Sequence, residues 1–221
     1  MAWSDTGDFT SGQILTAAAM DKVREAMFFG QATFTNEAAR DTAFANPGAL
    51  APITLQEGMR AYLTASTVAT ASGTDASIPS GILTVYNGSA WVCVTPVAAT
   101  TNATGTVTST SFTATLSGSP GTNPSVTLAT GTTALITLSG EVWNNTAGNG
   151  SVVGVAVSGA STVAATDANG MSNAITTAVA VSRSLVLTGL TAGTNTFTLQ
   201  YRVGGSTGNF RNRSIVVQGV A

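Results

Sequence analysis

The clearest pattern in the chain is TFTLQYRV at residues 196–203, in which Phe197, Leu199, Tyr201 and Val203 alternate with polar side chains. This period of two is typical of a strand with one buried face and one wet face. Sheets that keep one face solvated are commonly antiparallel. We therefore expect this segment to form a strand of an antiparallel sheet.

Similar apolar or alternating runs occupy the chain from about residue 98 to residue 221, and clusters of Gly, Asn and Ser separate them. The predicted strands are residues 107–116, 125–129, 134–143, 152–157, 184–187, 196–203 and 214–220. Short strands divided by turn signals in this way predict a two-sheet β-sandwich. The fold class expected for the whole chain is mainly β, with short N-terminal helices, a small β meander and a C-terminal antiparallel β-sandwich.

The segment before the sandwich, residues 49–97, is predicted to form the small β meander. Residues 59–63 alternate between apolar and polar side chains, as a half-buried strand does. Residues 64–80 show no periodicity and are interpreted as a loop.

A hairpin is predicted at the end of this segment, where residues 82–86 and 90–94 flank Asn87-Gly88. Asn-Gly is the strongest short signal for a hairpin, because both central residues of a type I′ turn need a positive φ. The aromatic side chains at its ends, Tyr86 and Trp91, either stack on a sugar ring or pack across the strand pair, and we expect packing.

The first region, residues 1–48, is predicted to be helical. Apolar residues recur every four positions between residues 14 and 29, which indicates an amphipathic helix. A shorter helix should begin at Asn36, whose side chain can cap the first turn, and should stop before Pro47. Two short helices cannot enclose a core, so this region needs a surface to dock on. The predicted docking or oligomer contacts are Trp3, Leu15, Ala19, Val23, Met27 and Phe28.

Composition excludes several classes of function. The chain of 221 residues has no histidine and a single cysteine, so imidazole chemistry, cysteine metal cages and intrachain disulfides are unavailable. Its net charge of -2 offers no basic excess to bind nucleic acid, and no apolar stretch is long enough to cross a membrane. We expect no catalytic residue, no cofactor or metal, no nucleic-acid partner and no membrane insertion.

The low proportion of charged residues, 8%, points to self-association. The outward positions of the predicted sandwich are mostly Thr, Ser and Ala, so copies of the chain can pack together without desolvating unpaired charges. We therefore expect a homo-oligomer.

Four residues of the sandwich are possible ligand contacts: Trp143, Arg202, Arg211 and Arg213. Arginine offers a bidentate fork for an anionic glycan or a phosphate, and tryptophan offers an apolar platform. The alternative is that Glu141 and Asp167, the only acids of residues 98–221, each pair with one arginine and that the remaining arginines serve solubility.

Parts of the sequence resemble proteins of tailed bacteriophages. Trp3, followed by GQILTAAAM at residues 12–20 and by Val23-Arg24, is similar to the opening of many small phage structural proteins. The pieces AARD at residues 38–41, GMRAYL at 58–63 and VYNGSAWV at 85–92 resemble a module that recurs in phage tail, fibre and head-surface proteins.

The C-terminal part resembles another group of folds. GLTAGTNTFTLQYR at residues 189–202 and NRSI at residues 212–215 resemble jelly-roll sandwiches of the trimeric, tumour necrosis factor-like kind found in fibre tips and head fibres. This resemblance implies a jelly-roll order of the strands and a homotrimer.

Together the resemblances imply a non-enzymatic structural protein of a virion, exposed on the particle as a minor tail or tail-fibre component. Its N-terminal region would dock on other virion proteins of the tail or head. A head-decoration or head-fibre protein is the first alternative. A carbohydrate-binding module or surface adhesin, with a host surface glycan as its partner, is the second.

Overall fold

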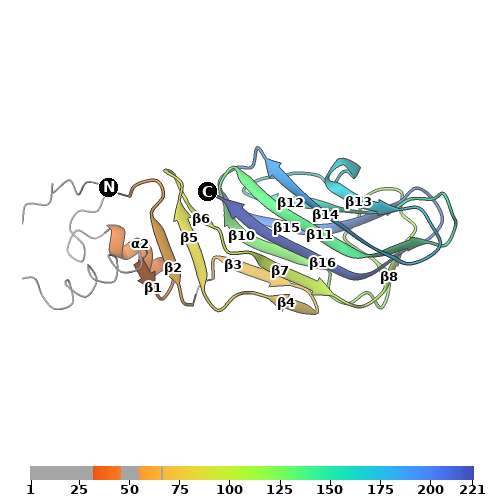
Figure 1. Ribbon diagram of the computed structural model, residues 1–221, viewed down its shortest axis with the longest axis horizontal. Coiled ribbons are helices and arrows are strands. Elements are labelled where there is room, and N and C mark those ends of the chain that lie inside the picture. The colour runs from red at the N-terminus through yellow and green to blue at the C-terminus, as the bar shows by residue number, and fades with distance from the viewer. Residues whose placement is uncertain (1–31, 46–54, 66) are drawn as a thin grey trace, which may run out of the picture.

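The computed structural model describes residues 32–45, 55–65 and 67–221. The helix predicted over residues 14–29 and the predicted docking contacts lie outside these ranges; those contacts are Trp3, Leu15, Ala19, Val23, Met27 and Phe28. In the described part, a small sheet with a short helix adjoins a larger β-sandwich (Figure 1). The fold is mainly β, as the sequence predicts.

Helix α2, residues Glu37–Ala45, begins where the sequence predicts. The side chain of Asn36 caps it, because its Oδ1 accepts the backbone N–H of Ala39 at 2.9 Å. Glu37 lies in the first turn, next to the positive end of the helix dipole. Local capping chemistry thus fixes the start of this helix.

The small sheet contains β1 (Ala32–Phe34), β2 (Arg60–Leu63), β5 (Ile82–Tyr86) and β6 (Trp91–Cys93), in that order. β1 runs parallel to β2, and the other pairs are antiparallel. The strand predicted at residues 59–63 and the predicted hairpin are confirmed.

The turn of this hairpin differs from the prediction. Gly88 has a φ of +90°, but Asn87 and the other described non-glycine residues of the hairpin have no positive φ. The N–H of Asn87 donates to the carbonyl oxygen of Ala90 at 3.0 Å, so Gly88 and Ser89 are the central residues. Glycine at the first central position is the pattern of a type II′ turn. The Asn87 side chain accepts the N–H groups of Ser89 and Ala90 at 3.2 and 2.9 Å, which holds Asn87 outside the central pair.

The larger part of the described chain forms a sandwich of two antiparallel sheets (Figure 1). The five-stranded sheet contains β3 (Ala69–Ser72), β10 (Ser125–Thr130), β12 (Ser151–Gly159), β13 (Gly170–Asn173) and β15 (Gly193–Val203). The seven-stranded sheet contains β4 (Asp75–Ser77), β7 (Val97–Thr101), β8 (Gly105–Val107), β9 (Ser117–Gly118), β11 (Thr133–Asn144), β14 (Val179–Thr188) and β16 (Gly208–Val220). A short 3₁₀ helix, η1 (Asp167–Asn169), precedes β13.

The strand order is that of a jelly roll. The five-stranded sheet has the order β13-β12-β15-β10-β3, and the main path of the other is β14-β11-β16-β7-β4. From β10 to β16 the chain therefore passes repeatedly between the sheets, as in double-sheet jelly rolls. Phe197 and Leu199 of β15 share one fully buried cluster with Ile136 and Leu138 of β11. The predicted antiparallel sandwich is confirmed, including the strand at residues 196–203.

The prediction of a loop at residues 64–80 is wrong, because β3 and β4 lie there. β3 pairs with β10 at the edge of one sheet, and β4 pairs with β7 at the edge of the other. Ala69 is the only buried hydrophobic residue of these two strands, and the remaining residues are small or polar. The two strands therefore lack the apolar alternation that reveals a strand in a sequence.

The prediction of a strand at residues 107–116 is also wrong over most of this range. β8 ends at Val107, and the segment after it contains side-chain turns: the Ser109 hydroxyl accepts the N–H of Ser111, and that of Thr113 accepts the N–H of Thr115. Such local hydrogen bonds compete with the pairing of strands. The short edge strand β13 was not predicted from the sequence either.

The small sheet packs against one end of the sandwich. Leu63, Ile82 and Cys93 belong to the same cluster of buried hydrophobic residues as the sandwich core. Gly219 of β16 permits this close approach, since a Cβ there would lie 2.7 Å from the carbonyl oxygen of Cys93. Gln218 adds a hydrogen bond from its Nε2 to the carbonyl oxygen of Val94 at 2.8 Å. The division into regions 1–48, 49–97 and 98–221 stays a prediction.

A β-bulge in β16 allows apolar side chains on both sides of it to point into the core. The register with β11 shifts between Ser139 and Glu141, so that Asn212 and Arg213 together oppose Gly140. Asn212 has a φ of +50°, the left-handed region that non-glycine residues rarely adopt. Because the extra residue shifts the alternation by one, Phe210 before it and Ile215 after it are both fully buried.

We expect Asn212→Val to lower the free energy of unfolding by about 1–3 kcal/mol, because a β-branched residue is strained at positive φ. Asn212→Gly removes the same side chain without that strain and should cost less than about 1 kcal/mol. Urea denaturation followed by circular dichroism measures both values. Equal losses for the two variants would mean that the hydrogen bonds of Asn212, and not its backbone, matter for stability.

Candidate functional site

The four possible ligand contacts do not come together in the structure. Trp143 and Arg211 lie on the outer face of the seven-stranded sheet, and Arg202 lies on the outer face of the five-stranded sheet. Arg213 lies between the two sheets, with only 1% of its surface exposed. They cannot form a single site within one copy of the chain.

Arg213 is a core residue, although the sequence placed it among the possible ligand contacts. Its guanidinium donates to Tyr201 Oη at 3.2 Å, to the carbonyl oxygen of Ala103 at 3.4 Å and to that of Pro120. It also lies 5.5 Å from the centre of the Tyr201 ring. Burial raises the pKa of Tyr201 to about 12, so its hydroxyl stays protonated and donates to Asn123 Oδ1 at 2.8 Å.

Arg202 pairs with Asp167, as the alternative interpretation of the sequence predicts. Arg202 Nε donates to Asp167 Oδ1 at 2.7 Å, and this contact holds the pKa of the Asp167 carboxyl below its usual value. The guanidinium also lies 5.5 Å from the centre of the Phe112 ring. The pair is a surface ion pair with an aromatic neighbour.

The second pair, Arg211 and Glu141, forms a polar cluster next to the bulge. Glu141 accepts hydrogen bonds from Arg211 Nε at 2.9 Å and from Asn212 Nδ2 at 2.8 Å. These two donors hold the pKa of Glu141 below its usual value, so the carboxylate is ionised at neutral pH. Arg211 also lies 5.8 Å from the centre of the Trp143 ring. A hollow of about 270 Å³ adjoins the cluster and is lined by Ser139, Gly140, Glu141, Ala180, Val181, Ser182 and Asn212.

Beyond this cluster, the outer face of the seven-stranded sheet carries no charge over three neighbouring strands. We call this surface the neutral face. Its residues are Thr133, Leu135, Thr137 and Ser139 on β11, the opposing Thr188, Val186, Ser184 and Ser182 on β14, and the opposing Val220, Gln218, Val216 and Ser214 on β16.

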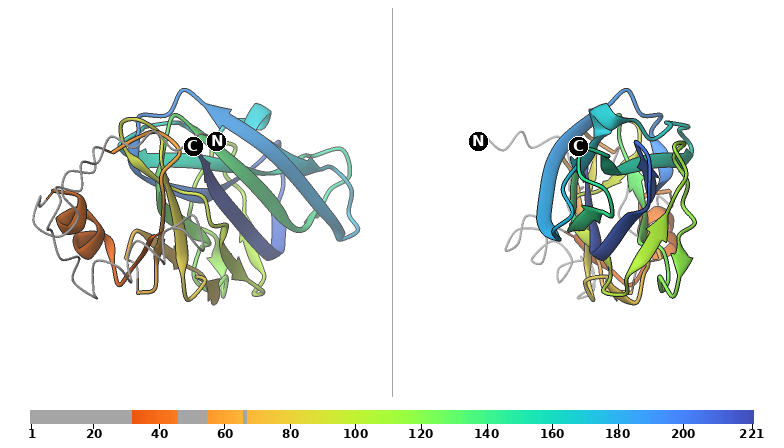
Figure 2. Two further views of the ribbon diagram at one scale, coloured as in Figure 1. Left: turned by 60° about the vertical axis from the view of Figure 1, so that its left-hand side comes forward. Right: turned by 90° about the vertical axis from the view of Figure 1, so that its right-hand side faces the viewer.

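Large apolar side chains on the neutral face are open to solvent. Leu135 is 39% exposed, Val186 61% and Val220 45%. β14 pairs with β11 on one side only among the described strands, and it runs along the outside of the sandwich (Figure 2). Long exposed apolar edge strands tend to pair or pack with another chain. The neutral face is therefore a candidate interface with another chain.

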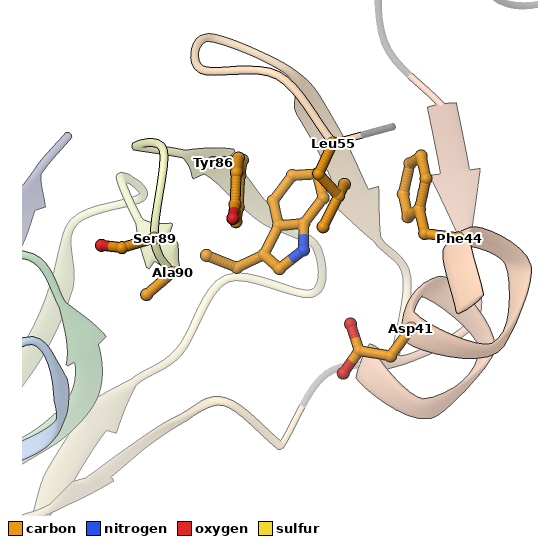
Figure 3. A pocket seen from close by; sticks show the side chains of 7 residues that line it. Asp41, Phe44, Leu55, Tyr86, Ser89 and Ala90 are labelled. Carbon is orange, nitrogen blue, oxygen red and sulfur yellow. The ribbon is translucent and has the colours of Figure 1, made fainter. Parts of the chain in front are cut away.

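A second candidate site lies on the small sheet, where a pocket of about 330 Å³ opens between α2 and the hairpin (Figure 3). It is lined by Asp41, Phe44, Leu55, Tyr86, Ser89, Ala90 and Trp91. The Trp91 ring lies 5.6 Å from both the Phe44 ring and the Tyr86 ring, centre to centre. Tyr86 and Trp91 thus pack across the strand pair, as expected, and they also form the wall of a pocket.

Comparisons with known proteins do not assign this chain to a family. No protein-family model matches the sequence, and no curated protein is significantly similar to it. In the described part of the chain, no helix is long and apolar enough to span a membrane. No group of three His, Cys, Asp or Glu among the same residues is placed to hold a metal ion.

We expect Cys93 to resist thiol reagents in the folded protein. Its side chain is fully buried, and burial raises its pKa to about 11, so about one thiol in a thousand is ionised at pH 8. Ellman's reagent should therefore react slowly with native protein at pH 8 and rapidly after unfolding in urea. Rapid labelling without urea would contradict the close contact between the small sheet and the sandwich.

Proposed function

We propose that the chain is a non-enzymatic structural protein of a bacteriophage particle, whose β-sandwich self-associates through the neutral face. The observation that carries self-association is the neutral face itself, with its exposed Leu135, Val186 and Val220. Burying such a surface against another copy desolvates no charge, and the removal of apolar area from water is favourable.

A homotrimer is the assembly we propose. The jelly-roll strand order agrees with the resemblance of residues 189–202 and 212–215 to trimeric sandwiches of the tumour necrosis factor-like kind. The polar cluster of Glu141, Arg211 and Asn212 borders the neutral face and would then form part of the rim of the interface. Interfaces commonly combine an apolar centre with a polar rim.

For the place in the particle, we propose a minor tail or tail-fibre component with the sandwich projecting outward. The support is the resemblance of residues 12–20, 38–41, 58–63 and 85–92 to phage tail, fibre and head-surface proteins. A head-decoration or head-fibre protein is the alternative, since the same module occurs in both settings. In either case residues 1–31 would provide the docking contacts.

We expect Thr137→Glu to convert the oligomer into monomers, because it places a charge in the middle of the neutral face. Thr198→Glu is the matched control: Thr198 points outward from the middle of β15 on the opposite sheet, and its substitution should leave the assembly intact. Sedimentation velocity measures the oligomeric state of both variants, and circular dichroism confirms that they fold. A wild-type protein that is monomeric at about 100 μM would refute self-association.

Deleting residues 1–31 should abolish incorporation into phage particles while leaving the described fold intact. The deletion stops there because β1 pairs with β2, and Phe44 of α2 packs on Trp91. Immunoblots of purified particles measure incorporation, and immunogold labelling with antibody to residues 98–221 distinguishes tail from head. Particles that carry the truncated protein at the wild-type level would rule out the docking role.

A further inference from the structure

We propose that the pocket between α2 and the hairpin is a binding site for a neutral pyranose ring of a glycan. Its volume of about 330 Å³ is at the lower end of the range for small-ligand sites, which is about 300–1,000 Å³. The inference does not depend on self-association or on a place in a virion, since a single copy supplies all the lining residues that the structure describes.

The aromatic side chains of the pocket form a wall and not a cage. Phe44, Trp91 and Tyr86 follow one another at 5.6 Å between ring centres, with interplanar angles of 34° and 56° (Figure 3). Arg40 lies over one face of the Trp91 ring, 4.6 Å from its centre, and is itself buried. Trp91 is half-buried, so part of its ring stays open to the pocket that it lines. Such a surface attracts the C–H groups on the apolar side of a sugar ring, since aromatic faces carry partial negative charge.

Polar groups at the rim suit the hydroxyl groups of a sugar. Asp41 has a side chain that is 58% exposed, and only its Oδ1 is engaged, by Arg40 Nε at 2.8 Å. No described residue donates to Asp41 Oδ2, which can therefore accept a hydrogen bond from a ligand hydroxyl. Ser89, exposed at the turn, donates its hydroxyl hydrogen to Asn87 Oδ1 at 3.1 Å, so its Oγ can accept a hydrogen bond from a ligand hydroxyl.

The charges beside the pocket disfavour the two other classes of small ligand, because Arg40 and Asp41 already pair with each other. A cationic ligand would meet the Arg40 guanidinium on the opposite side of the same Trp91 ring, and the rings do not face each other around a cation as aromatic cages do. An anionic ligand would be repelled by the Asp41 carboxylate at the rim. A neutral ligand with one apolar face and several hydroxyl groups remains, which is the chemistry of a pyranose.

The test uses the full-length protein and four probes: the methyl glycosides of glucose, galactose and N-acetylglucosamine, and the tetramethylammonium ion. Saturation-transfer NMR detects binding, and titration of the Trp91 indole N–H signal gives Kd. We expect at least one glycoside to bind and tetramethylammonium not to bind. If no glycoside shifts the Trp91 signal at about 50 mM, or if only tetramethylammonium does, the proposal is overturned.

Variants locate the site. Asp41→Ala, at an exposed position, and Phe44→Leu should each weaken glycoside binding by about fivefold or more. Phe112→Leu is the matched control for Phe44→Leu, since Phe112 lies on the sandwich beside Arg202, and it should leave Kd unchanged. Trp143→Phe tests whether binding occurs at the other tryptophan of the described chain, and it should leave Kd unchanged. Loss of binding in Trp143→Phe with full binding in Asp41→Ala and Phe44→Leu would place the site on the sandwich and overturn the proposal.

Discussion

One extra residue in β16 determines how the seven-stranded sheet meets the rest of the molecule. Side chains of a strand alternate between faces, so a long strand with a continuous register has one buried set along its whole length. In β16 the apolar residues on the two sides of Asn212 are out of phase, and the bulge brings Phe210, Ile215 and Val217 to the same interior. The core therefore depends on a left-handed backbone conformation, which asparagine tolerates better than most non-glycine residues do.

The same bulge divides the arginines of the strand between two roles. Arg211 points outward to Glu141 and Trp143, whereas Arg213 is enclosed, and its charge is balanced by carbonyl groups and the Tyr201 ring. Among the described residues Arg213 has no carboxylate partner, and its Nε has no hydrogen-bond partner. If the alternation that buries Phe210 continued without the bulge, Arg213 would lie on the outer face of the sheet; the bulge therefore helps to leave the neutral face uncharged.

Local signals predicted the elements whose formation depends on neighbours in the sequence. The Asn36 cap, the hairpin around Gly88 and the strand at residues 196–203 are of this kind. β3 was missed because its place is fixed by pairing with β10, a distant strand, and not by its own composition. The pocket was missed for a related reason: α2 brings Asp41 and Phe44 to Trp91 from far along the chain, and periodicity carries no information about such an approach.

The contact between the small sheet and the sandwich has a mechanical consequence. If the chain is held at its N-terminal end and loaded at the far end of the sandwich, the force passes from the small sheet into both halves of the sandwich, through β3 into one sheet and through β4 into the other. Gln218 and the glycine beside it couple the last strand to the same junction. A load applied between these two points is therefore shared by several backbone ladders and by the common core of the small sheet and the sandwich.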